Sequence, residues 1–533
     1  MRMNMFVALT ITIIGFAIYS NVLSGEFLSD DYKVIVENPA IRDLSNIREI
    51  WETFNTRFLV GLTFAINYHF GKLDVVGYHI FNVILHLINT FFVYQFLLLT
   101  YQAPALKNNP PRSRAPELAF YSALIFLCHP IQTQAVSFVT QRFVEMGTLF
   151  YILSLLFYAK ARLTKKRRYY IATGVMMILG FLSKEMTVTI VAMLWVYEFF
   201  FVGSSCGEFW KKIKAWLPFV VVTGVFPLVF LQNQPDSVWG LKEQVSTNSF
   251  DLRYFLTEIN VLRTYLRLFI LPISQIHEYD YPLVQEVWEF RTILSILVLF
   301  VLVIVAFRQF HKQRLISFAI VWFFITTSVE ITVASIVDRS LIYEHWLYLP
   351  MVGFAILLPV VLCAFFEDSR SVKRLMIAII FVLSLLTYQR NFVWQAEIGF
   401  WQDNIKKTPN IPQAHWGMGE AYQRKRLYRQ AYDSYQKAIS FLKGEDELTP
   451  LGERFYSALY SNLATVSFKL CRDDEMFQYF EKSLELDPQN TKTLNNLNQI
   501  LHFYEQHQDA SQVKRIREIL DANSGFLKYD KAL

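Results

Sequence analysis

"FVALTITIIGFAIYSNVLSGEFLSDD" (residues 6–31) joins a long apolar run to a pair of adjacent carboxylates, Asp30 and Asp31. About twenty consecutive apolar residues are enough to cross a bilayer as a helix. Because no A-x-A-like cleavage site precedes the carboxylates, we expect a retained span rather than a removed signal peptide. Neighbouring carboxylates repel each other, which raises one pKa and suits the pair to proton transfer, although Asp is also common in ordinary turns and helix caps.

The composition extends this pattern to most of the chain. Hydrophobic residues make up 53% of the 533 residues and charged residues only 18%, whereas a soluble protein carries about 25% charged residues. The net charge of +6 gives no reason to expect a nucleic-acid partner, because the basic residues cluster between apolar runs as topology signals do. The four cysteines lack CxxC spacing and indicate neither a zinc site nor a disulfide framework.

Eleven apolar runs are predicted to span the membrane, and the loops between them predict its orientation. Short basic loops such as "KARLTKKRR" (160–168) and "RQFHKQR" (308–314) stay on the cytoplasmic side. With eleven spans, all the basic loops share that side. The first loop (24–77), the segment 232–290 and the C-terminal tail then lie outside. The runs lie near 4–23, 78–100, 117–128, 143–159, 169–183, 186–202, 215–231, 291–307, 315–333, 347–365 and 375–389.

A further run, "INVLRTYLRLFILP" (259–272), carries Arg263 and Arg267 and is treated differently. A span here would place the basic loop 308–314 on the wrong side. We therefore expect a helix that lies in the outer interface with both arginines on one face.

The tail from residue 393 onward changes to a helical repeat. Gly419, Tyr422, Ala431, Tyr435 and Ala438 stand at the offsets of a tetratricopeptide repeat. A second copy covers 459–490, and a weaker third copy begins at 493. We therefore expect a membrane domain over 1–392 and a short repeat domain over 393–533. Such a stack either binds peptides on its concave face or simply stabilises or oligomerises the membrane part.

Ionisable residues gather at the predicted outer ends of the spans. Each is costly there and so raises a functional hypothesis, although any one alone could be a snorkelling side chain or a local ion pair. His79 heads a polar stripe with Asn82, His86 and Asn89, which helix–helix hydrogen bonding explains adequately. Besides Asp30 and Asp31, the gathered residues are Arg142, Glu145, Lys184, Glu185, Asp338, Arg339, Glu344 and His345.

The motifs also occur in a specific order. They include "FLSDDYKVIVENP" (27–39), "HPIQTQAVSFVTQRFVEMGTLFYILSLLFY" (129–158), "LSKEMTVTI" (182–190), "EHWLYLPMVGF" (344–354) and "RNFVWQAEIGFWQDN" (390–404). The set resembles the transmembrane and tetratricopeptide-repeat O-mannosyltransferases and their bacterial relatives, within the GT-C superfamily of polyprenyl-phosphate-dependent glycosyltransferases. The resemblance covers nearly the whole chain. One departure is Glu344–His345, where the family commonly shows an acidic residue followed by arginine.

This resemblance implies an all-α fold: a GT-C-type transmembrane bundle followed by a short tetratricopeptide-repeat solenoid. It implies transfer of a mannose-like sugar, with inversion, from a polyprenyl-phosphate donor to an acceptor hydroxyl, often Ser or Thr of a protein. A carboxylate must take the hydroxyl proton, and we expect Asp30 to do so while Asp31 orients it. Cations must hold the leaving phosphate. The candidate cations are Arg142, Lys184, Arg263, Arg267 and Arg339, and the candidate supporting residues are His79, Glu145, Glu185, Glu344 and His345.

Other functions stay open. The chain could be a non-catalytic membrane scaffold whose repeats bind a partner, or a GT-C transferase that acts on a lipid or surface glycan. A transporter is disfavoured, because the charges lie at the outer ends of the spans and not near the midplane. No ligand spacing supports a metal site, which leaves a divalent-metal requirement open. The compact loops and short repeat array favour a bacterial inner membrane with a periplasmic site, or the endoplasmic reticulum membrane in a eukaryote.

Overall fold

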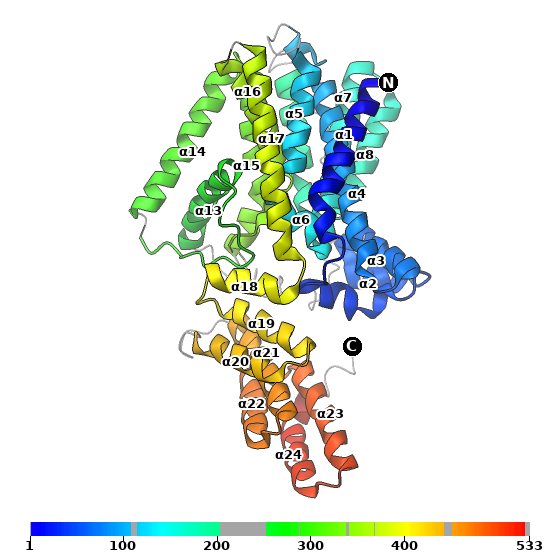
Figure 1. Cartoon of the computed structure of the whole chain (residues 1–533), viewed down its shortest axis with the longest axis vertical. Coiled ribbons are helices and arrows are strands. Elements are labelled where there is room, and N and C mark those ends of the chain that lie inside the picture. The colour runs from blue at the N-terminus through cyan, green and yellow to red at the C-terminus, as the bar shows by residue number, and fades with distance from the viewer. Residues whose placement is uncertain are drawn as a thin grey trace. The chain divides into compact units, whose positions relative to one another are not determined.

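The structure is a computed structural model, and all the regular structure that it describes is helical. The chain divides into two compact units, Met1–Ala396 and Glu397–Leu533 (Figure 1). This boundary lies a few residues beyond the position expected from the sequence. The described residues are 2–107, 114–202, 252–286, 288–336, 341–366, 368–441 and 450–527.

Within these ranges, seven helices of the first unit are long and apolar enough to cross a membrane. They coincide with seven of the predicted runs. Three further runs correspond to shorter helices, α5 (Ala115–Cys128), α8 (Arg167–Phe181) and α16 (Met351–Phe365), and the run 215–231 lies outside the described residues. The prediction of an all-α membrane protein is confirmed. The seven segments are Met3–Val22, Val75–Thr100, Val139–Thr164, Glu185–Val202, Phe290–Gln309, Arg314–Thr332 and Ser369–Trp394.

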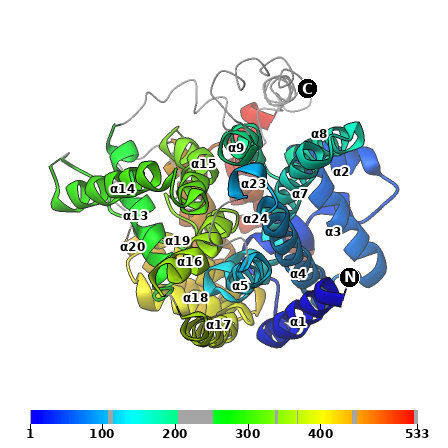
Figure 2. The same cartoon turned by 90° about the horizontal axis from the view of Figure 1, so that it is seen from above.

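The longer helices of the membrane unit surround α5. Seen from above, α5 lies between α4, α16 and α17, and it packs against all three (Figure 2). Its short length suffices because neighbouring helices, and not lipid, cover most of its side chains. The other helices of this part are α1 (Arg2–Tyr19), α4 (Val75–Thr100), α7 (Arg142–Thr164), α9 (Ile190–Tyr197), α13 (Leu252–Ile270), α14 (Phe290–Gln309), α15 (Arg314–Ile336) and α17 (Ser369–Asn391).

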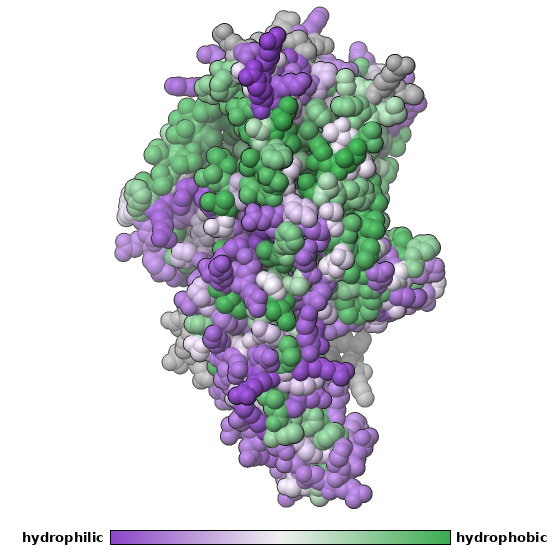
Figure 3. Space-filling model, in the orientation of Figure 1, coloured by the Kyte–Doolittle hydropathy of each residue, from purple (hydrophilic) through white to green (hydrophobic). Residues whose placement is uncertain are grey.

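Large apolar side chains face outward along several of these helices. Examples are Leu297 and Phe300 on α14 and Phe381 and Leu385 on α17. Figure 3 shows the resulting hydrophobic band across the membrane unit, with hydrophilic residues beyond it. A soluble protein rarely exposes so large an apolar surface to water, so these faces are the ones that contact lipid.

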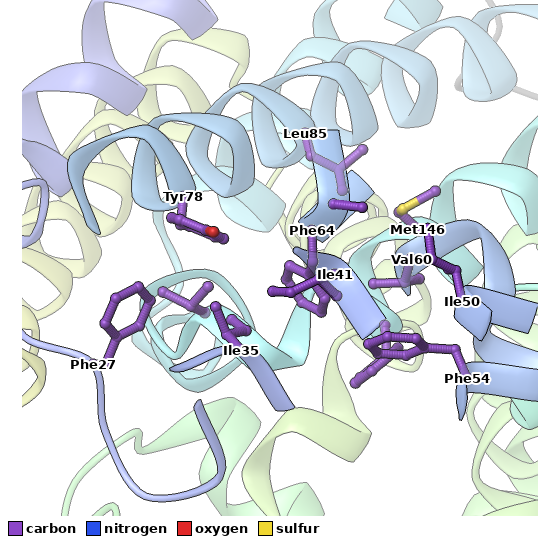
Figure 4. Close-up of a cluster of buried hydrophobic side chains, with 13 residues drawn as sticks. Phe27, Ile35, Ile41, Ile50, Phe54, Val60, Phe64, Tyr78, Leu85 and Met146 are labelled. Atoms are coloured by element: carbon purple, nitrogen blue, oxygen red, sulfur yellow. The ribbon is translucent and has the colours of Figure 1, made fainter. Parts of the chain in front are cut away.

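The first loop (24–77), which the sequence predicts to lie on the outer side, folds into a small helical layer. It contains η2 (Tyr32–Val36), η3 (Pro39–Ile41), α2 (Ile47–Phe54), η4 (Asn55–Arg57) and α3 (Phe58–Gly71). Asn46 starts α2 by accepting a hydrogen bond from the Glu49 backbone, as a helix N-cap does. Figure 4 shows the core of this layer, in which Phe27, Ile35 and Phe64 pack beside Tyr78 of α4. This shared core fixes the loop to the membrane helices.

In its described residues, 397–441 and 450–527, the second unit contains α18 (Glu397–Lys407) and three helix pairs, as the repeat pattern predicts. Gly419 lies where α19 meets α20, and a Cβ atom there would collide with the Tyr435 ring. The glycine therefore permits the close helix contact on which the repeat depends. The pairs are α19 (Pro412–Arg424) with α20 (Tyr428–Ser440), α21 (Pro450–Lys469) with α22 (Asp473–Leu486), and α23 (Thr491–Gln506) with α24 (Ala510–Leu527).

Candidate functional site

The segment that follows α5 forms the base of the site. Residues 130–141, which we call the platform segment, fold into η7 (Pro130–Gln132), α6 (Thr133–Ser137) and η8 (Val139–Gln141) and are buried throughout. Buried polar side chains require hydrogen-bond partners. Those of the platform segment find many of theirs in the outer loops, so this segment links parts of the chain that are far apart in sequence.

Asp31 is bound to one end of the platform segment. Its Oδ1 accepts hydrogen bonds from the Thr140 backbone N–H (2.7 Å) and from the Thr140 hydroxyl, and its Oδ2 accepts one from the Leu28 backbone N–H (3.0 Å). Asp31 is only 1% exposed. Burial raises the pKa of Asp31 to about 7, although the hydrogen bonds from Thr140 and Leu28 oppose the rise. Asp30, by contrast, is exposed, so the two adjacent carboxylates differ sharply in environment.

A tight turn presents this pair. The Asp31 backbone N–H donates to the Leu28 carbonyl (2.8 Å), and the Tyr32 N–H donates to the Ser29 carbonyl (3.1 Å). Ser29 has a φ of 41°, a left-handed value that is unfavourable for a residue with a side chain. Such strain persists only where the surroundings enforce it, and it is common at functional sites.

His79 lies in the first turns of α4, just after the first loop. A Cβ atom on Gly25 would stand 3.3 Å from His79 Nε2 and 3.2 Å from the Trp394 carbonyl oxygen. His79 is fully buried, and neither ring nitrogen has a hydrogen-bond partner among the described residues. Nearby, the Glu26 N–H donates to the Gln395 carbonyl (2.9 Å). The loop with the carboxylate pair and the end of the last membrane helix therefore lie at the same end of the membrane unit.

Arg142 follows the platform segment but is fully occupied by protein groups. Its Nε donates to Asn82 Oδ1 (2.7 Å), its Nη1 donates to Asn67 Oδ1 (2.7 Å) and Thr63 Oγ1 (3.1 Å), and its Nη2 donates to the Tyr78 carbonyl (3.1 Å). Its side chain is completely buried. Arg142 therefore joins α3, α4 and α7, and this position does not favour the phosphate contact expected from the sequence.

Glu145 lies one helical turn beyond Arg142 and forms no ion pair with it among the described contacts. Both carboxylate oxygens are buried and lack a hydrogen-bond partner in the described part of the chain. Only its backbone is engaged, because the Glu145 carbonyl accepts from Asn89 Nδ2 (3.0 Å). Among the described contacts, the Glu145 carboxylate therefore does not form a local ion pair with Arg142.

Lys184 and Glu185 also differ from the simple ion pair that the sequence permits. Glu185 accepts from Arg57 through both Nε (3.0 Å) and Nη2 (3.3 Å). The Arg57 guanidinium also lies 4.8 Å from the centre of the Phe143 ring. Lys184 is buried, and its Cβ faces Gly147 of α7. The structure thus brings two cations, Lys184 and Arg57, close together, and sequence reasoning missed Arg57.

Glu344 and His345 connect residues 275–279 to the platform segment. Glu344 is completely buried and accepts hydrogen bonds from Gln275 Nε2 (2.9 Å), the Ile276 N–H (2.7 Å) and the Tyr279 hydroxyl (2.6 Å). Burial raises the pKa of Glu344, while the positive charge of Arg390 opposes the rise. These contacts fix residues 275–279 in place.

Gln134 completes the connection at this end of the platform segment. Its Oε1 accepts from the His345 backbone N–H (2.6 Å), and its Nε2 lies 2.9 Å from His277 Nδ1. Because the Gln134 amide oxygen accepts the hydrogen bond from His345, the amide nitrogen faces the imidazole and donates to His277 Nδ1. Sequence reasoning missed both Gln134 and His277, although Gln134 is part of the motif 129–158.

Arg390 is another cation that sequence reasoning missed. It is 9% exposed, and its guanidinium carbon lies 5.7 Å from the centre of the Trp394 ring. Its charge acts on Glu344 and lowers the pKa of His277 beyond the larger lowering caused by burial. Arg390 opens the motif 390–404, which is the signal that could have identified it.

The two arginines of the predicted interfacial helix lie on α13, away from the contacts described above. Arg263 Nε donates to Ser295 Oγ (2.8 Å), and Arg267 Nη1 donates to the Ile273 carbonyl (3.2 Å). Both side chains are half-buried. The position of α13 in the membrane interface stays a prediction, and Asp338 and Arg339 lie outside the described residues.

Metal ligands are not clustered in the described ranges of the chain. No group of three His, Cys, Asp or Glu side chains there could hold a metal ion. The requirement for a divalent metal stays open. The site described so far consists of an exposed and a buried carboxylate at one end of the platform segment, with buried cations and polar networks around it.

Comparisons with known proteins identify several relatives of this chain. A Caenorhabditis elegans protein named Protein O-mannosyl-transferase F38B6.6 is 22% identical over 461 residues, which cover 82% of this chain and 62% of the relative. The human Protein O-mannosyl-transferase TMTC1 is 23% identical over 504 residues, 79% of this chain and 53% of the relative. The mouse TMTC2 protein of the same name is 30% identical over 214 residues, 37% of this chain and 24% of the relative. No protein-family model and no solved structure matches the chain.

The first two relatives extend beyond the matched length, since the chain spans only 62% and 53% of them. All three come from animals, so a bacterial source for this chain stays a prediction. The first two matches nevertheless cover about four fifths of the chain. The chain is a homologue of the proteins named protein O-mannosyl-transferase, and the resemblance inferred from its motifs is confirmed.

Proposed function

We propose that this protein is a membrane glycosyltransferase that moves a mannose-like sugar from a polyprenyl-phosphate donor to a Ser or Thr hydroxyl of a protein. The names of its homologues support the sugar and the protein acceptor. The observation that carries the proposal is the carboxylate pair, in which an exposed Asp30 adjoins a buried and immobilised Asp31. Such a pair at the outer end of the spans suits reaction between a membrane-bound donor and a hydroxyl from the aqueous side.

The two carboxylates have different roles in the proposed reaction. Asp30, which is exposed, takes the acceptor hydroxyl proton as that oxygen attacks the anomeric carbon, and the bond to the phosphate breaks with inversion. Asp31 accepts three hydrogen bonds from protein groups, so it orients the loop and does not itself receive the substrate proton.

The leaving phosphate requires cations. Lys184, one of the cations predicted from the sequence, lies close to Arg57, and Arg390 lies close to Glu344 and His277. We propose these three as the first candidates for the phosphate contact. Arg142 instead donates its hydrogen bonds to protein groups. Arg263 and Arg267 lie on α13, away from the other contacts of the site. Arg339 stays a candidate from the sequence.

The repeat unit offers a natural place for the acceptor polypeptide, because stacked helix pairs present an extended concave surface. We propose that it recruits the acceptor and that the site faces the outer side of the membrane. The bacterial inner membrane and the endoplasmic reticulum membrane both satisfy this orientation.

The test uses the full chain in lipid nanodiscs with a radiolabelled mannosyl polyprenyl phosphate and Ser/Thr-containing polypeptides. Transfer with inverted anomeric configuration is expected, and Asp30→Asn should abolish it while leaving the melting temperature unchanged. Glu37→Gln is the matched control, because Glu37 is an exposed carboxylate of the same loop. Full activity of Asp30→Asn would end the assignment of the base. Transfer only to lipid or glycan acceptors would replace the protein acceptor, and polypeptide binding without any transfer would favour the scaffold.

A further inference from the structure

The outer end of α3 carries large apolar side chains that the described parts of the chain leave uncovered. Phe70 is 83% exposed, and Ile66 and Leu73 are also exposed. Ile66 and Phe70 stand four residues apart and therefore share one face of α3, and Leu73 lies in the turn that follows. The opposite face of α3 contributes Phe64 to the buried core of the first outer loop. The exposed group is thus an apolar patch on an otherwise well-packed layer, and such patches mark interaction surfaces.

The position of this patch next to α4 indicates that the patch contacts lipid. Leu73 precedes α4 by two residues, and α4 exposes Ile80, Ile84 and Ile88 at intervals of four, a stripe that faces lipid. The 26 residues of α4 measure about 39 Å at 1.5 Å per residue. The hydrocarbon core is only about 30 Å thick, so part of α4 extends into the headgroup layer. The apolar surface therefore continues from the lipid-facing stripe to the end of α3 at the level of the outer headgroups.

One exposed cation, Lys72, lies in the turn between Phe70 and Leu73. Tyr68 is on the Phe64 face of α3 and packs against the buried core. The Lys72 ammonium lies 4.9 Å and the Arg42 guanidinium carbon 4.3 Å from the centre of the Tyr68 ring. Basic and aromatic residues placed just outside apolar ones match the order of phosphates and acyl chains at a membrane surface. Figure 3 shows hydrophobic and hydrophilic surface side by side on the lobe formed by α2 and α3.

We infer that the end of α3 is a membrane-surface anchor, in which Ile66, Phe70 and Leu73 enter the outer lipid layer while the exposed Lys72 faces lipid phosphates. The anchor is firmly connected to the carboxylate pair. Arg42 Nη2 donates to the carbonyls of Ile35 and Val36, in the helical turn that directly follows Asp31. The anchor thus holds the loop at a fixed height above the bilayer. This inference goes beyond the proposed function and depends only on the membrane location of the chain.

The experiment measures depth directly and does not depend on enzymatic activity. An environment-sensitive nitrobenzoxadiazole label is attached to Phe70→Cys in the full chain, with the four native cysteines replaced by alanine, in nanodiscs that contain brominated phosphatidylcholine. Ile84→Cys on the lipid-facing stripe of α4 and Lys492→Cys on the exposed surface of the second unit serve as lipid and water controls. Should the cysteine-free chain melt differently from the native chain, Phe70→Trp in the native chain gives the same readout as a difference in tryptophan quenching.

We expect brominated lipid to quench the label at position 70 at least half as strongly as the label at position 84. Aqueous iodide should quench it several-fold less than the label at position 492. Quenching by iodide at the level of position 492 would place the end of α3 in water and overturn the inference. Protection from both quenchers would show that protein covers the patch, as in contact with a second copy, and would overturn it equally.

Discussion

Replacing Thr140 by valine removes one hydrogen bond from Asp31 while keeping the shape of the side chain. The Thr140 and Leu28 backbone N–H groups still donate to the carboxylate, at 2.7 and 3.0 Å. A hydrogen bond to a charged group contributes about 1.5–3 kcal/mol, and one pKa unit corresponds to about 1.4 kcal/mol. Because the lost bond favours the ionised form, the pKa of Asp31 should rise from about 7 by roughly one to two units.

The assay is a pH titration of the protonated-carboxyl infrared band in the full chain, taken as the difference from Asp31→Asn. Thr133→Val is the matched control, because the buried Thr133 hydroxyl donates to the Pro130 carbonyl on the same platform segment and does not contact Asp31. The midpoint should move to higher pH in Thr140→Val and stay in place in Thr133→Val. An unchanged midpoint in Thr140→Val would refute the assigned role of this hydrogen bond.

The pH dependence of thermal stability provides an independent test of the raised pKa of Asp31. The pKa of Asp31 is higher in the folded chain than its ordinary value of 3.8, so the folded state binds the proton more tightly. Its contribution to stability is therefore fully present below about pH 4 and is lost as the pH rises to about 7, amounting to roughly 4 kcal/mol over that window. Relative to Asp31→Asn, the native chain should thus melt at a progressively lower temperature across this range. In Thr140→Val the decline should continue for one to two further pH units.

Two further substitutions test the packing on which the site depends. Asn82→Leu removes the acceptor of Arg142 Nε and leaves a buried charge short of a partner, so it should destabilise the chain by about 3 kcal/mol or more; a melting temperature within a degree of the native value would contradict this. Gly419→Ala should destabilise the repeat unit by about 1–3 kcal/mol, because the new methyl group meets the Tyr435 ring. Limited proteolysis should detect that loss, whereas Gly399→Ala, whose methyl group meets nothing within 4 Å, should be neutral or stabilising.

The candidate site illustrates which features a linear pattern reveals. Adjacent carboxylates directly after a span drew attention to Asp30 and Asp31 without any structure, because charge at a membrane boundary is costly and conspicuous. Arg142 was equally conspicuous, yet the structure gives it four neutral partners. Only the three-dimensional neighbourhood distinguishes a cation that is available to a ligand from one that holds helices together. Arg57 was missed for the complementary reason, since an arginine in an outer loop is unremarkable until its contact with Glu185 is known.

The sequence by itself determined the membrane class and the helical repeats, and it predicts that the carboxylate pair lies on the outer side. Each of these depends on local quantities: the length of an apolar run, the offset between small and aromatic residues, and the charge of a short loop. Tertiary structure alone decided that Asp31 is buried against Thr140 while Asp30 is exposed. It also decided that Gln134 joins His277 to His345. These facts depend on desolvation and on hydrogen bonds between segments separated by more than a hundred residues, and neither is encoded in the spacing of neighbouring residues.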